Sequence, residues 1–333
     1  MKNVIGIGNA LTDVLVTLAG DDVLENFGLP KGSMSLVDSE LQRRISESTA
    51  GLPVAMSLGG SAGNTIRAMA KLGTDTGFIG KVGNDETGDF LVAALENLGI
   101  KPAIFRGTAP SGVCMSLVSR DGERTMATYL GAALELGPDE IDGSMFGGCD
   151  CLYVEGYLVQ NHDLIERAVA EAKQNGLKVA IDLASYNVVE ENREFLRDLA
   201  DAYIDIIFAN EQEAHSFTGE KDPVRALDKI AGLAEIAVVK VGKEGAYIRQ
   251  GKESLHVGIM SEAVRVDTTG AGDFYAAGFL AGMCEGLSLR KCGTLGSIAA
   301  GKVIEVVGTT FDESVWEEVN ALADSVRADR CLF

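Results

Sequence analysis

Residues 266–273, Val-Asp-Thr-Thr-Gly-Ala-Gly-Asp, decide how this chain is interpreted. They indicate a short apolar approach, a turn of small residues and the start of a helix. Gly270, Ala271 and Gly272 leave their backbone N–H groups uncovered, so these groups can converge on an anion at a helix N-terminus, which carries a partial charge of roughly +0.5. Asp273 would stand beside that anion, where a carboxylate takes a proton from a nucleophile. The stretch therefore predicts the centre of a phosphotransferase.

A purely structural interpretation of the same stretch competes with this one. Asp can cap a helix, and Gly-Ala-Gly can simply let a turn close. Two features favour a site. Asp267 and Asp273 bracket the turn, where negative charge is costly unless a cation or a substrate hydroxyl balances it. Gly278 and Gly282 lie four residues apart on the following helix and allow close packing, at about 1 kcal/mol of helix propensity per glycine.

Composition limits the possible functions. The chain has 333 residues, of which 46% are hydrophobic, and can bury a large core in one big α/β domain or two ordinary ones. Its net charge of −20 argues against a nucleic-acid partner. The N-terminus begins directly in a strand-like run with no signal peptide, and no apolar run approaches membrane-spanning length. We expect a cytoplasmic protein with no membrane partner.

Short apolar β-branched runs alternate with helical patterns along most of the chain. Strands are predicted at residues 4–7, 53–58, 76–79, 151–154, 178–183, 204–209 and 236–241. Helices are predicted at residues 64–72, 86–98, 163–175, 193–202, 210–217 and 223–232. This alternation predicts an α/β fold with a doubly wound, mostly parallel sheet flanked by helices.

Two regions break this rhythm and alternate with a period of two. They comprise residues 12–19 with 33–37, and residues 104–105 with 113–119 and 124–130, where Asp121-Gly122 supplies a hairpin turn. We expect them to pair into a small β-sheet lid set apart from the main body. The expected division is a large domain of residues 1–11, 45–100 and 131–333, and a lid of residues 12–44 and 101–130.

Two glycine-rich motifs are rejected on their context. Residues 296–302 nearly match a P-loop, but Val303 lacks the hydroxyl that would hold Mg²⁺, and the segment lies within a helical run of small residues. Gly6 and Gly8 follow a strand as in a dinucleotide fingerprint, but Leu11 occupies the third glycine position.

A third motif supports a rival function. Residues 59–63, Gly-Gly-Ser-Ala-Gly, fit the nucleophile elbow of a serine hydrolase, with Ser61 as the nucleophile. Against this hypothesis, the only candidate bases are His162 and His215 in helical stretches and His256 in a predicted strand. The elbow would also come very early in the chain.

Several motifs together resemble one family, in the same order along nearly the whole chain. Residues 267–273 are similar to the C-terminal signature of the ribokinase (PfkB-type) carbohydrate and nucleoside kinases. Residues 58–64 with Ala68 and 71–73 are similar to the N-terminal signature, residues 80–88 to the turn that follows it, and residues 210–213 to the N-x-x-E motif. Independent matches in family order are more specific than any one motif.

The resemblance implies a role for each residue of the transfer centre. Asp273 would be the general base, and the backbone of Gly270, Ala271 and Gly272 would hold the migrating phosphoryl group of ATP. Asn210 and Glu213 would position Mg²⁺ through water. A capped helix with a solvated acidic first turn is the structural alternative for this pair.

The resemblance also implies two sets of binding residues. The nucleotide would be held by Lys240, Gly242, Gly245 and Thr268, although Lys240 stands where many members of the family have Thr. The hydroxyls of the acceptor would be held by Asp13, Gly59, Gly60 and Asn64. The structural alternatives are a surface lysine at a strand end and an exposed aspartate on a β-ribbon.

Two further features concern the lid and cations. Arg124 would reach from the lid toward the transferred phosphate, or would merely flank a hairpin. Asp267, Thr269 and Gly308 fall where members with a monovalent-cation site, such as a K⁺ site, place its ligands. Lid sheets in this family often form homodimers through an exposed face, and the alternation at residues 113–119 allows that arrangement.

The acceptor is left open between two classes. Residues 8–13, 153–157, 182–185 and 308–311 resemble the adenosine kinase branch more than ribokinase itself. Adenine needs apolar faces, which Met34, Leu36, Cys114, Met115 and Leu130 could supply, or these residues could form a minor core of the lid. We therefore predict phosphorylation of a primary hydroxyl, with adenosine as the leading acceptor and ribose, fructose or a related sugar as the alternative.

Overall fold

The short apolar runs pair side by side into one large mixed sheet. In the computed structural model, which describes residues 1–330, this sheet has nine strands in the order β14-β13-β12-β11-β10-β9-β1-β5-β6. The parallel strands are β1 (Asn3–Ile7), β5 (Asp75–Val82), β6 (Lys101–Arg106), β9 (Cys151–Glu155), β10 (Lys178–Asp182), β11 (Ile206–Asn210) and β12 (Ile236–Lys240). β13 (Ala246–Gln250) and β14 (Glu253–Val257) run antiparallel at one edge. The predicted α/β fold class is confirmed.

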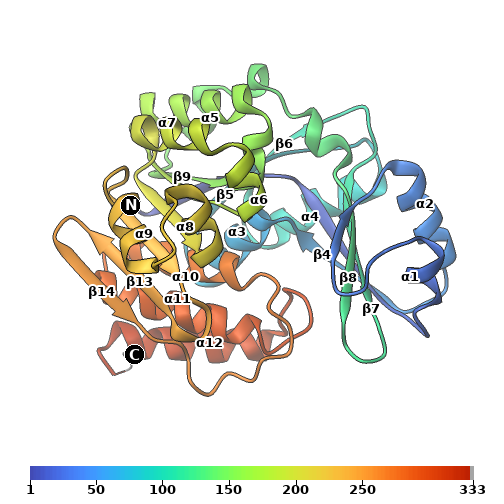
Figure 1. Cartoon of the computed structure of the whole chain (residues 1–333). Helices are drawn as coiled ribbons and strands as arrows, with labels where there is room; N and C mark the ends of the chain where they lie inside the picture. The colour runs from blue at the N-terminus through green and yellow to red at the C-terminus, as the bar shows by residue number, and fades with distance from the viewer. Residues whose placement is uncertain (331–333) are drawn as a thin grey trace.

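Helices cover both faces of this sheet, which explains why its central strands are apolar at consecutive positions. Val4 packs into the core on one face, and its neighbour Ile5 packs into the core on the other. The first core includes α3 (Ser61–Lys71), α4 (Glu86–Asn97), α10 (Ala271–Cys284), α11 (Leu289–Val303) and α12 (Glu313–Arg327). The second includes α5 (His162–Gln174), α6 (Tyr186–Glu191), α7 (Arg193–Tyr203), α8 (Glu211–Thr218) and α9 (Pro223–Ile230). Figure 1 shows α5 and α7 on one side of the sheet and α10 to α12 on the other.

The remaining short helices are 3₁₀ turns in the connections. They are η1 (Gly131–Glu135), η2 (Pro138–Glu140), η3 (Gly143–Phe146), η4 (Gly156–Gln160) and η5 (Gly242–Glu244). Within residues 1–330, no helix is long and apolar enough to cross a bilayer.

A separate small sheet is present, formed by most of the two period-two regions together with residues 54–59. Its strand order is β3-β8-β7-β2-β4, formed by β2 (Leu11–Thr17), β3 (Met34–Leu36), β4 (Val54–Gly59), β7 (Gly112–Val118) and β8 (Arg124–Tyr129). One face packs against α1 (Asp22–Asn26) and α2 (Ser39–Ser48), with Leu24 and Ile45 in a third core. Figure 1 shows the small sheet and these two helices beside the main body. The backbone of Gly122 has a φ of 85° in the β7–β8 hairpin.

Two predicted strands belong to the other sheet. The run at residues 53–58 was expected in the main sheet, but β4 pairs antiparallel with β2 at the edge of the small sheet. Residues 104–105 were expected in the lid, but β6 pairs parallel with β5. The intervening α4 explains the second difference, because a helical crossover returns the chain to a parallel position in the same sheet. Periodicity alone does not identify the partner of so short a run.

Candidate active site

The small-residue turn that precedes α10 has the geometry of an anion site. Gly270 is the N-cap of α10 with φ 75°, a left-handed conformation that favours glycine. A Cβ at this position would lie 2.6 Å from Cγ2 of Thr309. The helix begins at Ala271, two residues before the predicted carboxylate, so Asp273 lies in its first turn. The N–H of Ala271 donates to the carbonyl oxygen of Thr268 at 3.2 Å. The N–H groups of Gly270 and Gly272 are therefore the ones that this turn offers to an anion beside Asp273.

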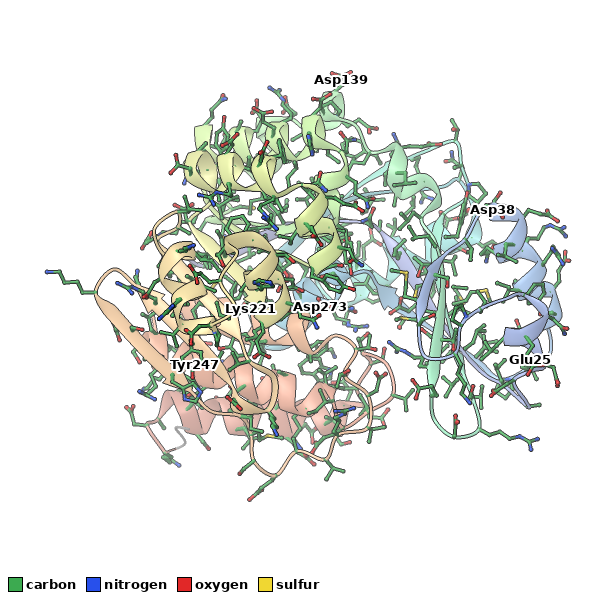
Figure 2. The ribbon with its side chains drawn as sticks, viewed as in Figure 1. Glu25, Asp38, Asp139, Lys221, Tyr247 and Asp273 are labelled. Atoms are coloured by element: carbon green, nitrogen blue, oxygen red, sulfur yellow. The ribbon has the colours of Figure 1, made fainter. Side chains whose placement is uncertain are left out.

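A cleft of about 1670 Å³ lies between the small sheet and the main body. It is lined by most of the predicted site residues, namely Asp13, Gly60, Asn64, Arg124, Asn210, Glu213, Lys240, Gly242, Gly245, Thr268, Thr269, Gly270, Ala271, Gly272 and Asp273. Figure 2 labels Asp273 near the middle of the molecule, between the two parts. Gly59 is packed behind the lining, since a Cβ there would lie 2.2 Å from Oδ1 of Asp13. Residues from distant parts of the chain thus meet at one cleft.

Asp273 is half-buried and held by two donors from α3. The Ser61 hydroxyl donates to its Oδ1 at 2.7 Å, and the Asn64 side-chain amide donates to its Oδ2 at 3.0 Å. Burial raises the pKa of Asp273 to about 7, although both hydrogen bonds oppose that rise. A carboxylate with this pKa accepts a proton readily at neutral pH.

Ser61 is therefore a partner of Asp273 and not the nucleophile of a hydrolase. His162 bonds to Asn192 and stacks on Phe195, and His256 bonds to the backbone carbonyl oxygen of Glu244. His215 is exposed on α8. Within residues 1–330, the Ser61 hydroxyl donates to Asp273 and to none of these histidines.

A buried arginine on α3, which no sequence motif indicated, bonds to several groups around Asn64. Arg67 is 6% exposed and donates to the backbone carbonyl of Leu58, to Oδ1 of Asn64, and to the carbonyl and hydroxyl oxygens of Thr309. Burial lowers its pKa to about 10, which leaves the group positive at neutral pH. Arg67 thus ties α3 to the loop behind the anion turn. Its signal was an arginine between the apolar residues Ile66 and Ala68, three positions after Asn64.

Asp13 closes the small-sheet side of the cleft. Burial raises the pKa of its carboxyl group, and the positive charges of Arg67 and Arg124 oppose the rise. Asp13 is paired in register with Cys114 of β7 and Ser57 of β4. A half-buried carboxylate that lines a cleft is suited to accept hydrogen bonds from ligand hydroxyls.

Arg124 crosses from the small sheet to the loop before the anion turn. Its Nη1 lies 3.2 Å from Oδ2 of Asp267, with only 8% and 16% of the two side chains exposed. The Asp267 carboxylate also accepts hydrogen bonds from the N–H of Gly308 and from the N–H and hydroxyl of Thr269. The three predicted ligands of a monovalent cation, Asp267, Thr269 and Gly308, are therefore bonded to one another. In this structure the positive partner of the Asp267 carboxylate is the guanidinium of Arg124.

The ammonium of Lys240 lies among carboxylates on the main-body side of the cleft. Lys240 Nζ lies 2.6 Å from Oδ2 of Asp182, which had been given no role. Glu213 and Asn210 form a reciprocal cap, in which the carboxylate accepts the backbone and amide hydrogens of Asn210. Burial raises the pKa of Glu213, and the negative charge of Asp182 raises it further.

These residues fit a divalent cation that is held through water. The buried carboxylates of Asp182 and Glu213 and the half-buried carboxylate of Asp273 face the ammonium of Lys240, so added positive charge is favourable there. Within residues 1–330, no group of three His, Cys, Asp or Glu residues could hold a metal ion. Mg²⁺ commonly keeps several waters and binds through one or two carboxylates with substrate phosphates. The donor set agrees with that mode.

Comparison with known proteins identifies the family. A family model described as pfkB family carbohydrate kinase matches residues 37–316. The chain belongs to the PfkB family. A sugar kinase from Archaeoglobus fulgidus, described as uncharacterized, is 31% identical over 72% of this chain and 95% of its own length. The PfkB assignment confirms the resemblance to ribokinase-like kinases, and the chain is a kinase.

Two solved kinase structures support the same conclusion. A probable sugar kinase from Rhizobium etli is 33% identical, with a TM-score of 0.85 over 99% of both chains. An adenosine kinase from Sinorhizobium meliloti is 34% identical, with a TM-score of 0.84 over 98% of this chain and 99% of that one. The family implies ATP as co-substrate and a divalent metal. One of these two proteins is described as a sugar kinase and the other as a nucleoside kinase.

Proposed function

We propose that this kinase transfers the terminal phosphoryl group of ATP to a primary hydroxyl of a nucleoside, with adenosine as the leading acceptor. The observation that carries the proposal is the position of Asp273. Its half-buried carboxylate lies in the first turn of α10, directly beside the backbone of the anion turn, and has a pKa raised to about 7. A base and a phosphate-binding turn thus share one side of the cleft.

The chain's residues suggest how the transfer proceeds. Asp273 accepts the proton of the attacking hydroxyl, while Asp13 and Asn64 orient the acceptor. The N–H groups of Gly270 and Gly272 stabilise the charge on the phosphoryl oxygens during in-line transfer. Asn210 and Glu213 are placed to hold Mg²⁺ through water, and this ion would neutralise phosphate charge when bound. The small sheet closes over the cleft as a lid, held by the ion pair between Arg124 and Asp267, and this closure keeps water away from ATP.

The lining near Asp13 favours a nucleoside over a simple sugar. Met34, Leu36, Cys114 and Leu130 line the cleft from the small sheet, and Tyr157 lines it from the main body. Aliphatic and aromatic side chains suit the flat faces of a purine, whereas a sugar needs mainly polar partners. Met115 was predicted to join them but packs in the core of the small sheet with 2% exposure. Its side chain points to the opposite face because neighbours in a strand alternate.

The proposal is tested by ADP release over a panel of nucleosides, pentoses and hexoses, with and without K⁺. Adenosine is expected to give the highest kcat/KM, with AMP as product. Preference for ribose or fructose would replace the nucleoside proposal with the sugar alternative. No ATP-dependent product from any acceptor would overturn the proposal altogether.

A further inference from the structure

The end of β12 carries a charged residue directly against the anion turn. A Cβ built on Gly272 would lie 3.1 Å from Nζ of Lys240, so the ammonium and the turn are in contact distance. The Lys240 side chain is 14% exposed and lines the cleft. The Asp273 carboxylate and the N–H groups of Gly270 and Gly272 approach the same space from α10.

Asp182 fixes the position of that ammonium. It is the last residue of β10, and its carboxylate reaches across the end of β11 to Lys240 at 2.6 Å. Asp182 is 5% exposed, and its Oδ1 also accepts the N–H of Ala184. The Lys240 side chain is therefore held over Gly272 by a partner that is itself anchored.

The surrounding charges keep Lys240 protonated. Burial alone would lower its pKa, but the negative charges of Asp182, Glu213 and Asp273 raise it overall. An ammonium that stays protonated beside the backbone of the anion turn forms a strong site for the charged oxygens of a phosphoryl group. A hydroxyl at this position would supply a hydrogen bond without the charge.

We propose that Lys240 is a catalytic residue that donates directly to the transferred phosphoryl group of ATP, and that Asp182 is the positioning residue that holds it over the anion turn. This inference rests on the proposed function. It adds a charged donor to a turn that otherwise offers only backbone groups. When nucleotide binds, the ammonium shares its hydrogens between Asp182 and a phosphate oxygen.

Calorimetric binding of ATP, ADP and adenosine to the full-length protein tests Lys240. For Lys240→Met, the ATP dissociation constant is expected to rise by about 10- to 100-fold, the usual effect of losing a hydrogen bond between charged groups. The effect on ADP should be smaller and that on adenosine absent, because only ATP carries the terminal phosphate. Lys240→Arg should recover part of the ATP affinity.

Two further variants separate this role from a structural one. Lys240→Met leaves the Asp182 carboxylate buried without its partner, so the double variant Lys240→Met/Asp182→Asn removes both charges. If Lys240 only balances Asp182, the double variant will regain ATP affinity; if Lys240 binds phosphate, the defect will persist. Lys173→Met breaks a comparable pair with Asp205 at the opposite end of the sheet, where Nζ lies 2.7 Å from Oδ2, and should leave ATP binding unchanged.

Asp182→Asn tests the positioning role through a split between binding and turnover. Removing a negative charge should leave the ATP dissociation constant equal or lower, while kcat falls by about 10-fold or more because the ammonium is no longer fixed. ATP affinity in Lys240→Met equal to that in Lys173→Met would overturn the inference. If the wild-type chain phosphorylates no acceptor but ATP affinity still depends on Lys240, the proposed function fails while the phosphate contact stands.

Discussion

At the scale of single residues, the site depends on carboxylates that are kept out of water. Asp273 and Glu213 both have raised pKa values because burial disfavours their charged forms. The charged forms of such groups lower the stability of a fold, and such groups gather where proton transfer takes place. The two donors on Asp273 hold its oxygens in place without abolishing its basicity.

Replacing the proposed base should separate catalysis from binding. Asp273→Asn keeps the shape and can still bond to Ser61 and Asn64, but cannot accept a proton. We expect kcat to fall by about 10²- to 10⁴-fold, the usual contribution of a general base, with ATP affinity nearly intact. Steady-state kinetics and calorimetric ATP binding measure the two quantities. Near-normal turnover in this variant would rule out the assignment of the base.

The raised pKa of Asp273 predicts how activity depends on pH. Because only the deprotonated carboxylate acts as a base, kcat/KM for the acceptor should rise with pH and level off above an apparent pKa near 7. Glu213 interacts with the same cluster, so the apparent value belongs to the group. A rate profile from pH 5.5 to 9 measures it. A flat profile across this range would contradict the prediction.

The raised pKa of Asp273 also makes the free energy of unfolding depend on pH. The folded-state pKa of about 7 exceeds the ordinary 3.8, so the folded protein binds this proton more tightly than the unfolded chain. The resulting stabilisation is complete below pH 4 and is lost as pH rises to about 7. Above pH 7, Asp273→Asn should therefore be more stable than the wild-type chain in urea denaturation. Equal stability of the two at pH 8 would show that burial of the charge costs little.

Ser61→Ala distinguishes the kinase role of this serine from the hydrolase hypothesis. The Ser61 hydroxyl stabilises the charged form of Asp273 and so lowers its pKa. Removing it should shift the pH–rate profile to higher pH, with most of the activity recovered at alkaline pH. A serine nucleophile would instead leave no activity at any pH. Kinetics at two pH values decide between these outcomes.

At the scale of elements, the contact between α10 and α11 depends on glycine. A Cβ on Gly278 would lie 2.4 Å from the backbone oxygen of Leu295, which cannot move independently of its helix. Gly278→Ala should therefore destabilise the fold by about 1–3 kcal/mol. Gly63→Ala is the matched control within α3, because its Cβ would lie 3.7 Å from Leu58 and replacing a helical glycine gains about 0.5–1 kcal/mol. Chemical denaturation of both variants provides the comparison.

Most elements of the main sheet follow from local pattern, but their partners do not. The runs that became β9 to β12 were predictable because strands buried on both faces are continuously apolar. β4 and β6 were assigned to the wrong sheets because each run is short and its partner is distant in sequence. Short helices such as α1 carry too few residues for a clear period.

Site residues that are adjacent in sequence were predicted, whereas contacts between residues distant in sequence were not. The turn at residues 270–272 and the capping pair of Asn210 with Glu213 were visible because their parts are adjacent in sequence. The bonds from Ser61 to Asp273 and from Asp182 to Lys240 span 212 and 58 residues and carry no local signal. Only the sheet topology brings those residues together.

At the scale of the whole molecule, an acidic protein has to attract a polyanion. The net charge is −20, yet Arg124 and Lys240 line the cleft together with the N-terminus of α10, and Arg67 lies behind its lining, bonded to Asn64. Each of these cations is buried against a carboxylate or a carbonyl, so its charge acts locally with little screening by salt. We therefore expect the ATP affinity to depend only weakly on ionic strength.

The position of the small sheet as a lid depends on the Arg124–Asp267 pair. This pair joins β8 to the loop before the anion turn and is mostly shielded from water. Arg124→Ala leaves Asp267 without its positive partner, which favours separation of the two parts, and each 1.4 kcal/mol lost raises the ratio of open to closed forms tenfold. A broader and longer distance distribution between spin labels on α2 and α12 is expected, together with more ATP hydrolysis per acceptor phosphorylated because water enters the cleft. Arg43→Ala is the control, since Arg43 pairs with Glu40 and Glu47 on the exposed side of α2 and should change neither quantity. An unchanged distance distribution in Arg124→Ala without ligands would mean that other contacts hold the small sheet in place.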